Sequence, residues 1–326
     1  MMKKFSFDEL CDFISGVRGN VAILTHERAD ADTIGSAAAL SEIFASAGAN
    51  PKICSPDGIP DRLSFFGIEN AEPEDGDILI SVDVPSLEQL GRFAALKDRI
   101  VLKIDHHRFS EEYAPFYVDG GCAAAGEIVF DIFEALRKRG TAGEPTMRFC
   151  MSVYAAISSD TGGFRFSNTT PATHMRAAEL LKSGIDASEI NRLLFENLSE
   201  KEVAVRRTAY SSVNIYDGRI AAVTITKAER ELCGADMNDI SCAIDVPRGI
   251  RGVEAAALIK ESDSENEYRI SLRSNTDLDV SAVAGTFGGG GHIRAAGASL
   301  IAHSPEEAEK TVVDAIRKQM AAQGMT

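Results

Sequence analysis

The first half of the chain alternates short apolar runs with longer segments in which apolar residues recur at helical spacing. Four short runs are predicted to be strands: Val21–Leu24, Lys52–Cys54, Ile78–Val82 and Ile100–Ile104. Three longer segments are predicted to be helices: Thr33–Ala47, Ser86–Leu96 and Met147–Ile157. The alternation predicts an α/β fold with a doubly wound, mainly parallel sheet that carries helices on both faces.

The second half of the chain shows a different pattern. Ile215–Ile220 contains an Asp-Gly pair and is followed by the apolar run Ala221–Thr226, which predicts a hairpin. Val253–Lys260 and Tyr268–Arg273 predict a second pair of strands, and Ser304-Pro-Glu-Glu307 predicts a capping box that opens a final amphipathic helix. We therefore expect a smaller C-terminal α/β domain with a mixed sheet. The expected organisation is an N-terminal domain over 1–195, a helical linker over 196–212 and a C-terminal domain over 213–326, with a cleft between the two domains.

Composition restricts the class of protein. The chain has 326 residues, is 44% hydrophobic and contains no apolar run near the ~18 residues that cross a bilayer. The first residues turn acidic before a signal-peptide core could form. No Cys-x-x-Cys pair occurs among the six cysteines. We therefore expect a cytoplasmic protein with reduced thiols and no membrane association.

The net charge is −15, from 49 acidic and 34 basic residues. Long duplex nucleic acid normally requires a basic surface, so such a partner is disfavoured. A short anionic substrate remains compatible with this charge if metal ions and a few local arginines supply the positive field.

Three potential metal ligands follow the first predicted strand, in the pattern His26-x-x-x-Asp30-x-Asp32. Two carboxylates and an imidazole crowded into seven residues would repel one another and lose hydration, and a bound dication such as Mn²⁺ would remove both problems. The alternative interpretation is a polar loop with a helix cap, because aspartate is common at that position.

Further polar residues follow other predicted elements. Asp83 follows the predicted strand Ile78–Val82, and Asp105-His106-His107 follows the predicted strand Ile100–Ile104. Asp160 follows the predicted helix Met147–Ile157. Ligands of parallel sheets collect outside the carboxyl ends of the strands. Each of these residues alone could be an ordinary turn or cap residue, but their joint occurrence favours a metal site.

The order and spacing of His26-x-x-x-Asp30-x-Asp32, Asp83, Asp105-His106-His107 and Asp160-Thr-Gly-Gly-Phe164 resemble the four motifs of the DHH phosphoesterase superfamily. Gly288-Gly-Gly-Gly-His-Ile-Arg-Ala-Ala-Gly297 and Arg273-Ser274 resemble the associated DHHA1 domain. The chain looks closest to the stand-alone oligoribonuclease and 3′-phosphoadenosine 5′-phosphate (pAp) phosphatase type. It looks less like long RecJ exonucleases, which carry further nucleic-acid-binding modules.

The resemblance implies a site with two divalent metal ions, for which Mn²⁺ is the expected metal. His26, Asp30 and Asp83 would hold one ion, and the other would be held by Asp32, Asp83, His106 and Asp160. The two ions would activate a water molecule for attack on phosphorus. His107 would face the substrate and donate to a phosphoryl oxygen or the leaving group, and Asp105 would sit near the metals as an orienting group.

The glycine run is expected to contribute to substrate binding. Backbone N–H groups of Gly289, Gly290 and Gly291 could form an anion nest, whereas a lone glycine run would more often be a flexible loop. Arginine and histidine side chains near the run add donors that favour a pocket for the terminal phosphate and base of a short oligonucleotide. The expected substrate-binding residues beside the glycines are Arg273, Ser274, His292 and Arg294.

Two positions depart from the family pattern. Val84-Pro85-Ser86 follows Asp83 where the family often has a further aspartate and an arginine. Gly163 stands where many relatives have an arginine, and the sequence leaves open whether Arg165 replaces it.

The resemblance implies a metal-dependent phosphoesterase that trims short oligonucleotides to mononucleotides, removes the 3′-phosphate of pAp, or does both. One alternative is hydrolysis of cyclic or linear dinucleotides at the same site, and another is a non-catalytic nucleotide-binding regulatory module. Family II pyrophosphatases share the N-terminal motifs but end in a different domain, so the Gly288–Gly297 loop argues against them. A homodimer is a family expectation.

Overall fold

The computed structural model describes residues 2–325 and divides into two compact units, Met1–Asn197 and Leu198–Thr326. The segment predicted as a helical linker contains helix α7 (Glu200–Ser212), which lies in the second unit. Its residues Val205 and Ala209 are fully buried against Val223 and Ile225. Helix α7 is therefore a packed part of the second domain.

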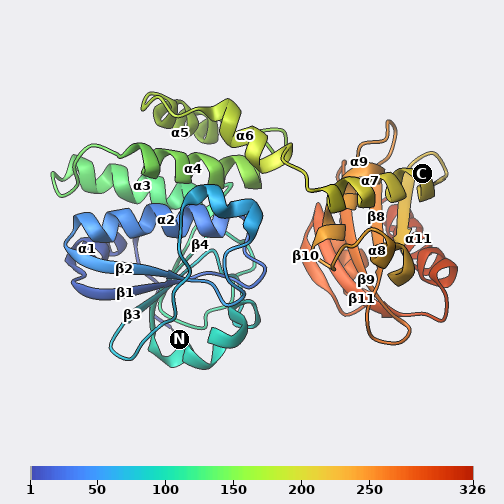
Figure 1. Ribbon diagram of the computed structural model, residues 1–326, viewed down its shortest axis with the longest axis horizontal. Helices are drawn as coiled ribbons and strands as arrows, with labels where there is room; N and C mark the ends of the chain where they lie inside the picture. Colours follow the sequence, from blue (N-terminus) through green and yellow to red (C-terminus); the bar gives the residue numbers. More distant parts are fainter. Residues whose placement is uncertain (1, 326) are drawn as a thin grey trace. The chain divides into compact units, whose positions relative to one another are not determined.

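The first sheet is parallel in every strand pair, which confirms the prediction of a mainly parallel sheet (Figure 1). Strand β1 lies between β2 and β3, so the direction of winding reverses at β1. In this strand order, ligands bind at the switch point between β1 and β3. The strands in spatial order are β2 (Ala49–Cys54), β1 (Gly19–Leu24), β3 (Ile78–Val82), β4 (Ile100–Asp105) and β5 (Phe116–Val118).

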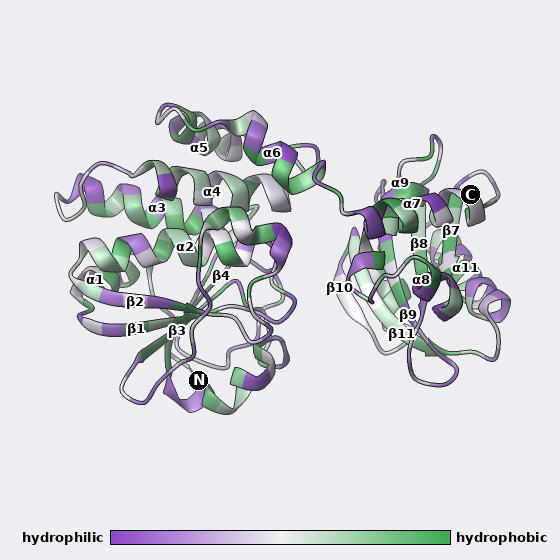
Figure 2. Cartoon of the chain, in the orientation of Figure 1, coloured by the Kyte–Doolittle hydropathy of each residue, from purple (hydrophilic) through white to green (hydrophobic). Residues whose placement is uncertain are grey.

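One face of this sheet is covered by α-helices (Figure 1). Strand residues that point to this face, such as Ile23, Val82 and Ile104, are buried in one apolar cluster with the helices. Helix α2 is hydrophobic or neutral along most of its length, as Figure 2 shows. The helices are α1 (Phe7–Gly16), α2 (Ala31–Ser46), α3 (Ala125–Lys138) and α4 (Met147–Asp160), with α5 (Pro171–Leu181) and α6 (Ala187–Phe195) packed on α4.

The opposite face is covered differently from the prediction. The segment predicted as a helix over Ser86–Leu96 forms 3₁₀ turns, η2 (Glu88–Arg99), interrupted at Gly91 with φ 54°. Leu90 and Phe93 are buried on Leu24 and Leu79. Their spacing of three residues matches the three-residue period of a 3₁₀ helix, so the turn geometry follows the apolar pattern. Another 3₁₀ segment, η1 (Asp61–Phe66), lies on the side of the α-helices and contacts α2.

The second sheet is mixed, as predicted: β7 and β8 pair in parallel and all other pairs are antiparallel. The predicted Asp-Gly hairpin is present, with Asp217 at φ 56° and Gly218 at φ 68°. Positive φ at both residues suits the twist of a tight hairpin. In spatial order the strands are β10 (Gly290–His292), β11 (Ala295–Ile301), β9 (Glu267–Ser274), β8 (Ala255–Glu261), β7 (Ile220–Ile225) and β6 (Asn214–Tyr216).

Helices cover both faces of the second sheet. One face packs on α10 (Val280–Gly285) and α11 (Pro305–Ala322), and the other packs on α7, η3 (Asp239–Ile244) and α9 (Asp245–Arg248), while α8 (Lys227–Leu232) follows β7. Ser304 caps α11 by accepting a hydrogen bond from the Glu307 N–H at 3.2 Å. The predicted capping box is only half formed, because the Glu307 carboxylate accepts from the N–H of His303 instead. No helix within residues 2–325 is long and apolar enough to span a bilayer.

Candidate metal centre

The six ligands predicted from sequence converge at the carboxyl edge of the first sheet. The side chains form three groups of potential metal-binding atoms, and within each group these atoms lie within 4.8 Å of one another. Asp83 belongs to two of the groups. The groups are His26 with Asp30 and Asp83, Asp32 with His106 and Asp160, and Asp83 with His106 and His107.

Asp30 is both a helix cap and a neighbour of His26. Its Oδ1 accepts hydrogen bonds from the N–H groups of Asp32 and Thr33 at 3.0 and 3.1 Å, which caps α2. The same oxygen lies 3.6 Å from Nε2 of His26. The cap interpretation of this residue is therefore confirmed, and the cap also fixes the carboxylate beside the imidazole.

The carboxylate of Asp32 is held rigidly by the start of α3. Its oxygens accept from the N–H groups of Ala125 at 2.7 Å and Gly126 at 3.0 Å, and from the Ser36 hydroxyl at 2.9 Å. A Cβ on Gly126 would lie 2.6 Å from the Cβ of Ala156 in α4. Glycine is therefore required for α3 and α4 to approach so closely around Asp32.

Asp83 follows β3 with φ 60°, a left-handed conformation that is rare outside glycine. The Asp83 N–H donates to the carbonyl of Ile104 at 2.9 Å, which keeps the residue in line with β4. Its Oδ2 lies 3.7 Å from Nε2 of His26, and its Oδ1 lies 3.4 Å from Nε2 of His106. Asp83 thus stands between the two imidazoles, and its strained backbone is of the kind that functional sites retain.

Nε2 of His106 faces three carboxylates. It lies 3.4 Å from Asp83 and Asp160 and 3.6 Å from Asp32, whereas Nδ1 lies 3.3 Å from the carbonyl of Cys122. Neither His106 Nε2 nor Asp83 Oδ1 has a hydrogen-bond partner, although both atoms are buried. Such atoms are costly unless something else, such as a cation, binds them.

The electrostatics of the cluster favour the binding of a positive charge. Burial and the neighbouring Asp83 raise the pKa of Asp32 to about 7, and burial together with Asp32 raises the pKa of Asp160 above its usual range. Burial opposes protonation of His26, but Asp30 and Asp83 outweigh it and raise its pKa to about 10. A cation would relieve this repulsion among carboxylates.

The residues fit a divalent metal ion. Carboxylate oxygens and imidazole nitrogens are the donor set that ions such as Mn²⁺, Fe²⁺ or Zn²⁺ accept. Ligand bonds of about 2.1 Å leave atoms that share one ion roughly 3 to 3.5 Å apart. The separations of 3.4 Å from His106 to Asp83 and Asp160 fall within that spacing, and those of 3.6 and 3.7 Å to Asp32 and between His26 and Asp83 lie slightly above it.

Asp105, the last residue of β4, is bonded to His107. Its Oδ1 accepts from the His107 ring Nδ1 at 2.8 Å and from the N–H groups of His106 and His107 at 2.9 and 3.2 Å. Burial would raise the pKa of Asp105, but His107 and the buried Lys103 outweigh it and hold that pKa well below its usual range. Lys103 is not among the site residues predicted from sequence, although a lysine inside the apolar run Ile100–Ile104 is a signal that could have identified it.

The predicted substrate-binding residues of the second domain lie at one end of three neighbouring strands. Arg273 of β9 pairs in register with Ala295 of β11, which in turn pairs with His292 of β10. The Ser274 N–H donates to the carbonyl of Arg294 at 3.0 Å. The Arg294 guanidinium forms an ion pair with Asp277 at 2.9 Å, so a substrate phosphate would have to compete with that carboxylate.

The glycines of the run differ in what they contact. A Cβ on Gly289 would lie 2.2 Å from the carbonyl oxygen of Gly297, and one on Gly291 would lie 2.5 Å from that of Ala295. These two glycines are needed for the close approach of β10 to β11. A Cβ on Gly290 would meet nothing within 4 Å, so packing does not explain that glycine.

The turn after Asp160 explains why position 163 is a glycine where many relatives have an arginine. Gly163 has φ 69°, which an arginine would adopt only with strain. The Arg165 side chain donates through Nε to the carbonyl of Gly162 at 2.5 Å and lies over the ring of Phe195.

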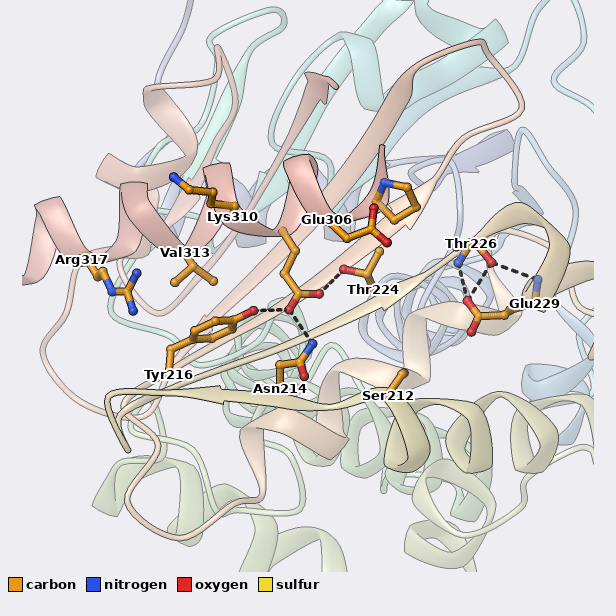
Figure 3. A pocket seen from close by; sticks show the side chains of 12 residues that line it. Ser212, Asn214, Tyr216, Thr224, Thr226, Glu229, Glu306, Lys310, Val313 and Arg317 are labelled. Atoms are coloured by element: carbon orange, nitrogen blue, oxygen red, sulfur yellow. Dashed lines mark hydrogen bonds between the residues drawn. The ribbon is translucent and has the colours of Figure 1, made fainter. Parts of the chain in front are cut away.

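A surface groove of about 440 Å³ lies in the second domain, among β6, β7, α8 and α11 (Figure 3). Glu309 is buried in it and accepts hydrogen bonds from Asn214, Tyr216 and Thr224 at 2.8, 2.6 and 2.6 Å. Both oxygens of this carboxylate are satisfied by the protein, so the groove gives no sign of a bound ligand.

Comparison with known proteins agrees with the residue patterns. Residues 20–157 match the model of the DHH family N-terminal domain, and residues 218–322 match that of the DHHA1 domain. A bifunctional oligoribonuclease and PAP phosphatase of Bacillus subtilis is 26% identical over 89% of this chain and 91% of its own length. The protein of the same description from Thermus thermophilus is 28% identical over 97% of this chain and 94% of its own length.

A solved structure shows the same fold. The crystal structure of an exopolyphosphatase-related protein from Bacteroides fragilis matches with a TM-score of 0.85 and 22% sequence identity. The match covers 96% of this chain and 95% of the other.

Proposed function

The chain carries a DHH domain followed by a DHHA1 domain and is a hydrolase of phosphate esters, and we propose that its substrates are short oligonucleotides and pAp. The two relatives described as oligoribonuclease and PAP phosphatase support this substrate class, because they match along nearly their whole length. The observation on which the proposal rests is the placement of Asp83 between His26 and His106 at 3.7 and 3.4 Å.

Two divalent ions would bind in the cluster, with Asp83 shared between them, and Mn²⁺ is the metal we propose to test first. When bound, such ions acidify water and neutralise charge on a phosphoryl group. His26 and Asp30 would complete the site of one ion, and the site of the other would be completed by Asp32, His106 and Asp160.

The contribution of His107 would depend on Asp105. The hydrogen bond from Nδ1 to the Asp105 carboxylate fixes the orientation of the imidazole. A contact to substrate would therefore be made by the other ring nitrogen, Nε2. We propose that the ring, when it carries a proton on both nitrogens, donates from Nε2 to a phosphoryl oxygen or to the leaving group of the substrate. Asp105 would thus act on the reaction by orienting His107.

Binding of the rest of the substrate would fall to the second domain. Arg273 and Arg294 would pair with a phosphate, and Ser274, His292 and the N–H groups around Gly290 would add hydrogen bonds. The cleft between the two domains and the formation of a homodimer stay predictions.

The test is a substrate panel assayed with purified protein. Dinucleotides to pentanucleotides, pAp and cyclic dinucleotides are each incubated with Mn²⁺, and the released mononucleotide or phosphate is measured. We expect mononucleotide from the short oligonucleotides and phosphate from pAp, and we expect Asp83→Ala to abolish both.

Two other outcomes would replace the proposal. Faster hydrolysis of cyclic or linear dinucleotides than of longer oligonucleotides and pAp would favour the dinucleotide phosphodiesterase alternative. Inactivity of the intact protein on the whole panel, together with measurable nucleotide binding, would favour the non-catalytic binding module.

A further inference from the structure

Lys103 is fully buried in the middle of β4, beside the candidate site. Burying an ammonium group is costly unless it is paired and hydrogen-bonded. Its Nζ lies 3.5 Å from Oδ2 of Asp105 and donates to the carbonyls of Glu111 at 2.8 Å and Pro85 at 3.2 Å. The ammonium also lies over the ring of Tyr113, at 4.7 Å from its centroid. A group held from so many sides is suited to hold its partner still.

The partner that Lys103 holds is the carboxylate of Asp105. Oδ2 faces Lys103 and accepts a short hydrogen bond from the hydroxyl of Ser110. Oδ1 is then directed to His107, through the ring Nδ1 at 2.8 Å and the backbone N–H at 3.2 Å. Because each oxygen has its own partners, the carboxylate cannot rotate without breaking bonds on both sides.

We propose that Lys103 is a positioning residue for His107 and acts through Asp105. The carbonyls of Pro85 and Glu111 fix the ammonium, the ammonium fixes Oδ2 of Asp105, and Oδ1 of Asp105 sets the orientation of the imidazole. The expected effect of Lys103 on catalysis rests on the proposed function of His107. The expected effect of Lys103 on the orientation of the His107 ring does not rest on it.

The kinetic test is a double-mutant cycle of Lys103→Met and Asp105→Asn, assayed with Mn²⁺ and a dinucleotide. We expect Lys103→Met alone to lower kcat about 10-fold or more with KM within about 2-fold, because coupled neighbours interact at this level. In the Asp105→Asn background the same substitution should change kcat by less than about 2-fold. Equal losses in both backgrounds would show that Lys103 acts independently of Asp105 and would overturn the proposal.

A matched control removes another lysine that is ion-paired in the same sheet. Lys52 of β2 lies 2.9 Å from Asp77 and contacts none of the site residues named above. Lys52→Met should lower thermal stability and leave kcat unchanged. A fall in kcat equal to that of Lys103→Met would assign the effect to general destabilisation and contradict the proposal.

NMR of ¹⁵N-histidine-labelled protein tests the geometry without turnover. The His107 imidazole signals, assigned with His107→Gln, should shift in Lys103→Met and stay unchanged in Lys52→Met. If the wild type hydrolyses nothing on the panel, the proposed function fails, yet this measurement still decides the positioning. Unchanged His107 signals in Lys103→Met would overturn the proposal.

Leaving Asp105 buried without its cation could prevent Lys103→Met from folding. In that event Asp105→Asn is compared with the double variant, which removes both charges. Equal kcat and equal His107 spectra would support action through Asp105. A further loss in the double variant would contradict it.

Discussion

Oδ1 of Asp83 and Nε2 of His106 lie 3.4 Å apart, and neither of these buried atoms has a hydrogen-bond partner. The two residues follow the neighbouring parallel strands β3 and β4, so the fold itself forces them together. Each unsatisfied buried polar atom costs about 1 to 3 kcal/mol. Such a pair persists most readily when a third group completes the interaction, and a metal ion is a group that these two residue types can bind.

Binding of Mn²⁺ should therefore raise the thermal stability of the protein. At a free concentration about 100 times the dissociation constant, a ligand specific to the folded state adds about 2.7 kcal/mol. For a domain of this size that corresponds to an increase in Tm of roughly 5 to 10 °C. The measurement is thermal unfolding in EDTA and then in excess Mn²⁺.

Asp83→Ala should remove most of this increase, because Asp83 belongs to two of the three groups of candidate metal ligands. Its Tm in EDTA should stay near or above that of the wild type, since one of the mutually repelling carboxylates is gone. Asp75→Asn is the control, because Asp75 is a fully exposed carboxylate of the same domain. A full Mn²⁺ shift in Asp83→Ala would contradict a site built around Asp83.

The sequence predicts the parts of the site that lie at strand ends. His26, Asp83 and His106 each follow an apolar run, and parallel pairing brings the ends of such runs to one edge. The sequence does not predict what the packing adds. The close approach of α3 and α4 at Gly126, and the burial of Lys103 under Asp105, depend on distances between segments far apart in the chain.

The glycine run shows the same limit. From sequence Gly289, Gly290 and Gly291 look equivalent, but only Gly290 has open space where a Cβ would lie. The segment Ser86–Leu96 is a similar case, since apolar residues spaced by three fit both an α-helix and the 3₁₀ turns that form. Local patterns limit the options, and tertiary contacts choose among them.

Substitutions in the glycine run should separate packing from binding. Gly290→Ala should leave Tm unchanged and raise KM about 3- to 10-fold, because the added methyl group keeps a phosphate from the backbone N–H groups. Gly289→Ala should lower the stability of the domain by about 1 to 3 kcal/mol, because its Cβ would collide with β11. Thermal unfolding and KM for a dinucleotide are measured on both variants. An unchanged KM in Gly290→Ala would argue for a loop without a binding role.

The two arginines predicted to bind substrate should differ in importance. Arg273 of β9 pairs with Ala295 of β11, the residue that follows Arg294. Loss of a hydrogen bond to a charged group costs about 1.5 to 3 kcal/mol. Arg273→Gln should therefore raise KM roughly 10- to 100-fold. Arg294→Gln should have a smaller effect, because this side chain is paired with Asp277. Asp277→Asn should act in the opposite direction and lower KM by releasing Arg294. Equal effects of the two arginine substitutions would show that Asp277 does not compete.

The packing of α2 on α4 should control the metal site from a distance. A Cβ on Gly35 would lie 2.5 Å from the carbonyl oxygen of Ser152, so Gly35→Ala must move the two helices apart. Asp32 lies on α2 and Asp160 at the end of α4, so this movement separates two carboxylates that face His106. We expect a loss of about 1 to 3 kcal/mol in stability and a higher Mn²⁺ concentration for half-maximal activity.

Gly16→Ala is the matched control for this substitution, because a Cβ on Gly16 at the end of α1 would meet nothing within 4 Å. It should leave stability nearly unchanged or slightly higher, since alanine restricts the unfolded chain more than glycine does. Its Mn²⁺ dependence should match that of the wild type. If Gly35→Ala lowers stability but keeps the wild-type Mn²⁺ dependence, the α2–α4 contact supports the fold alone, and the separation of Asp32 from Asp160 does not depend on it.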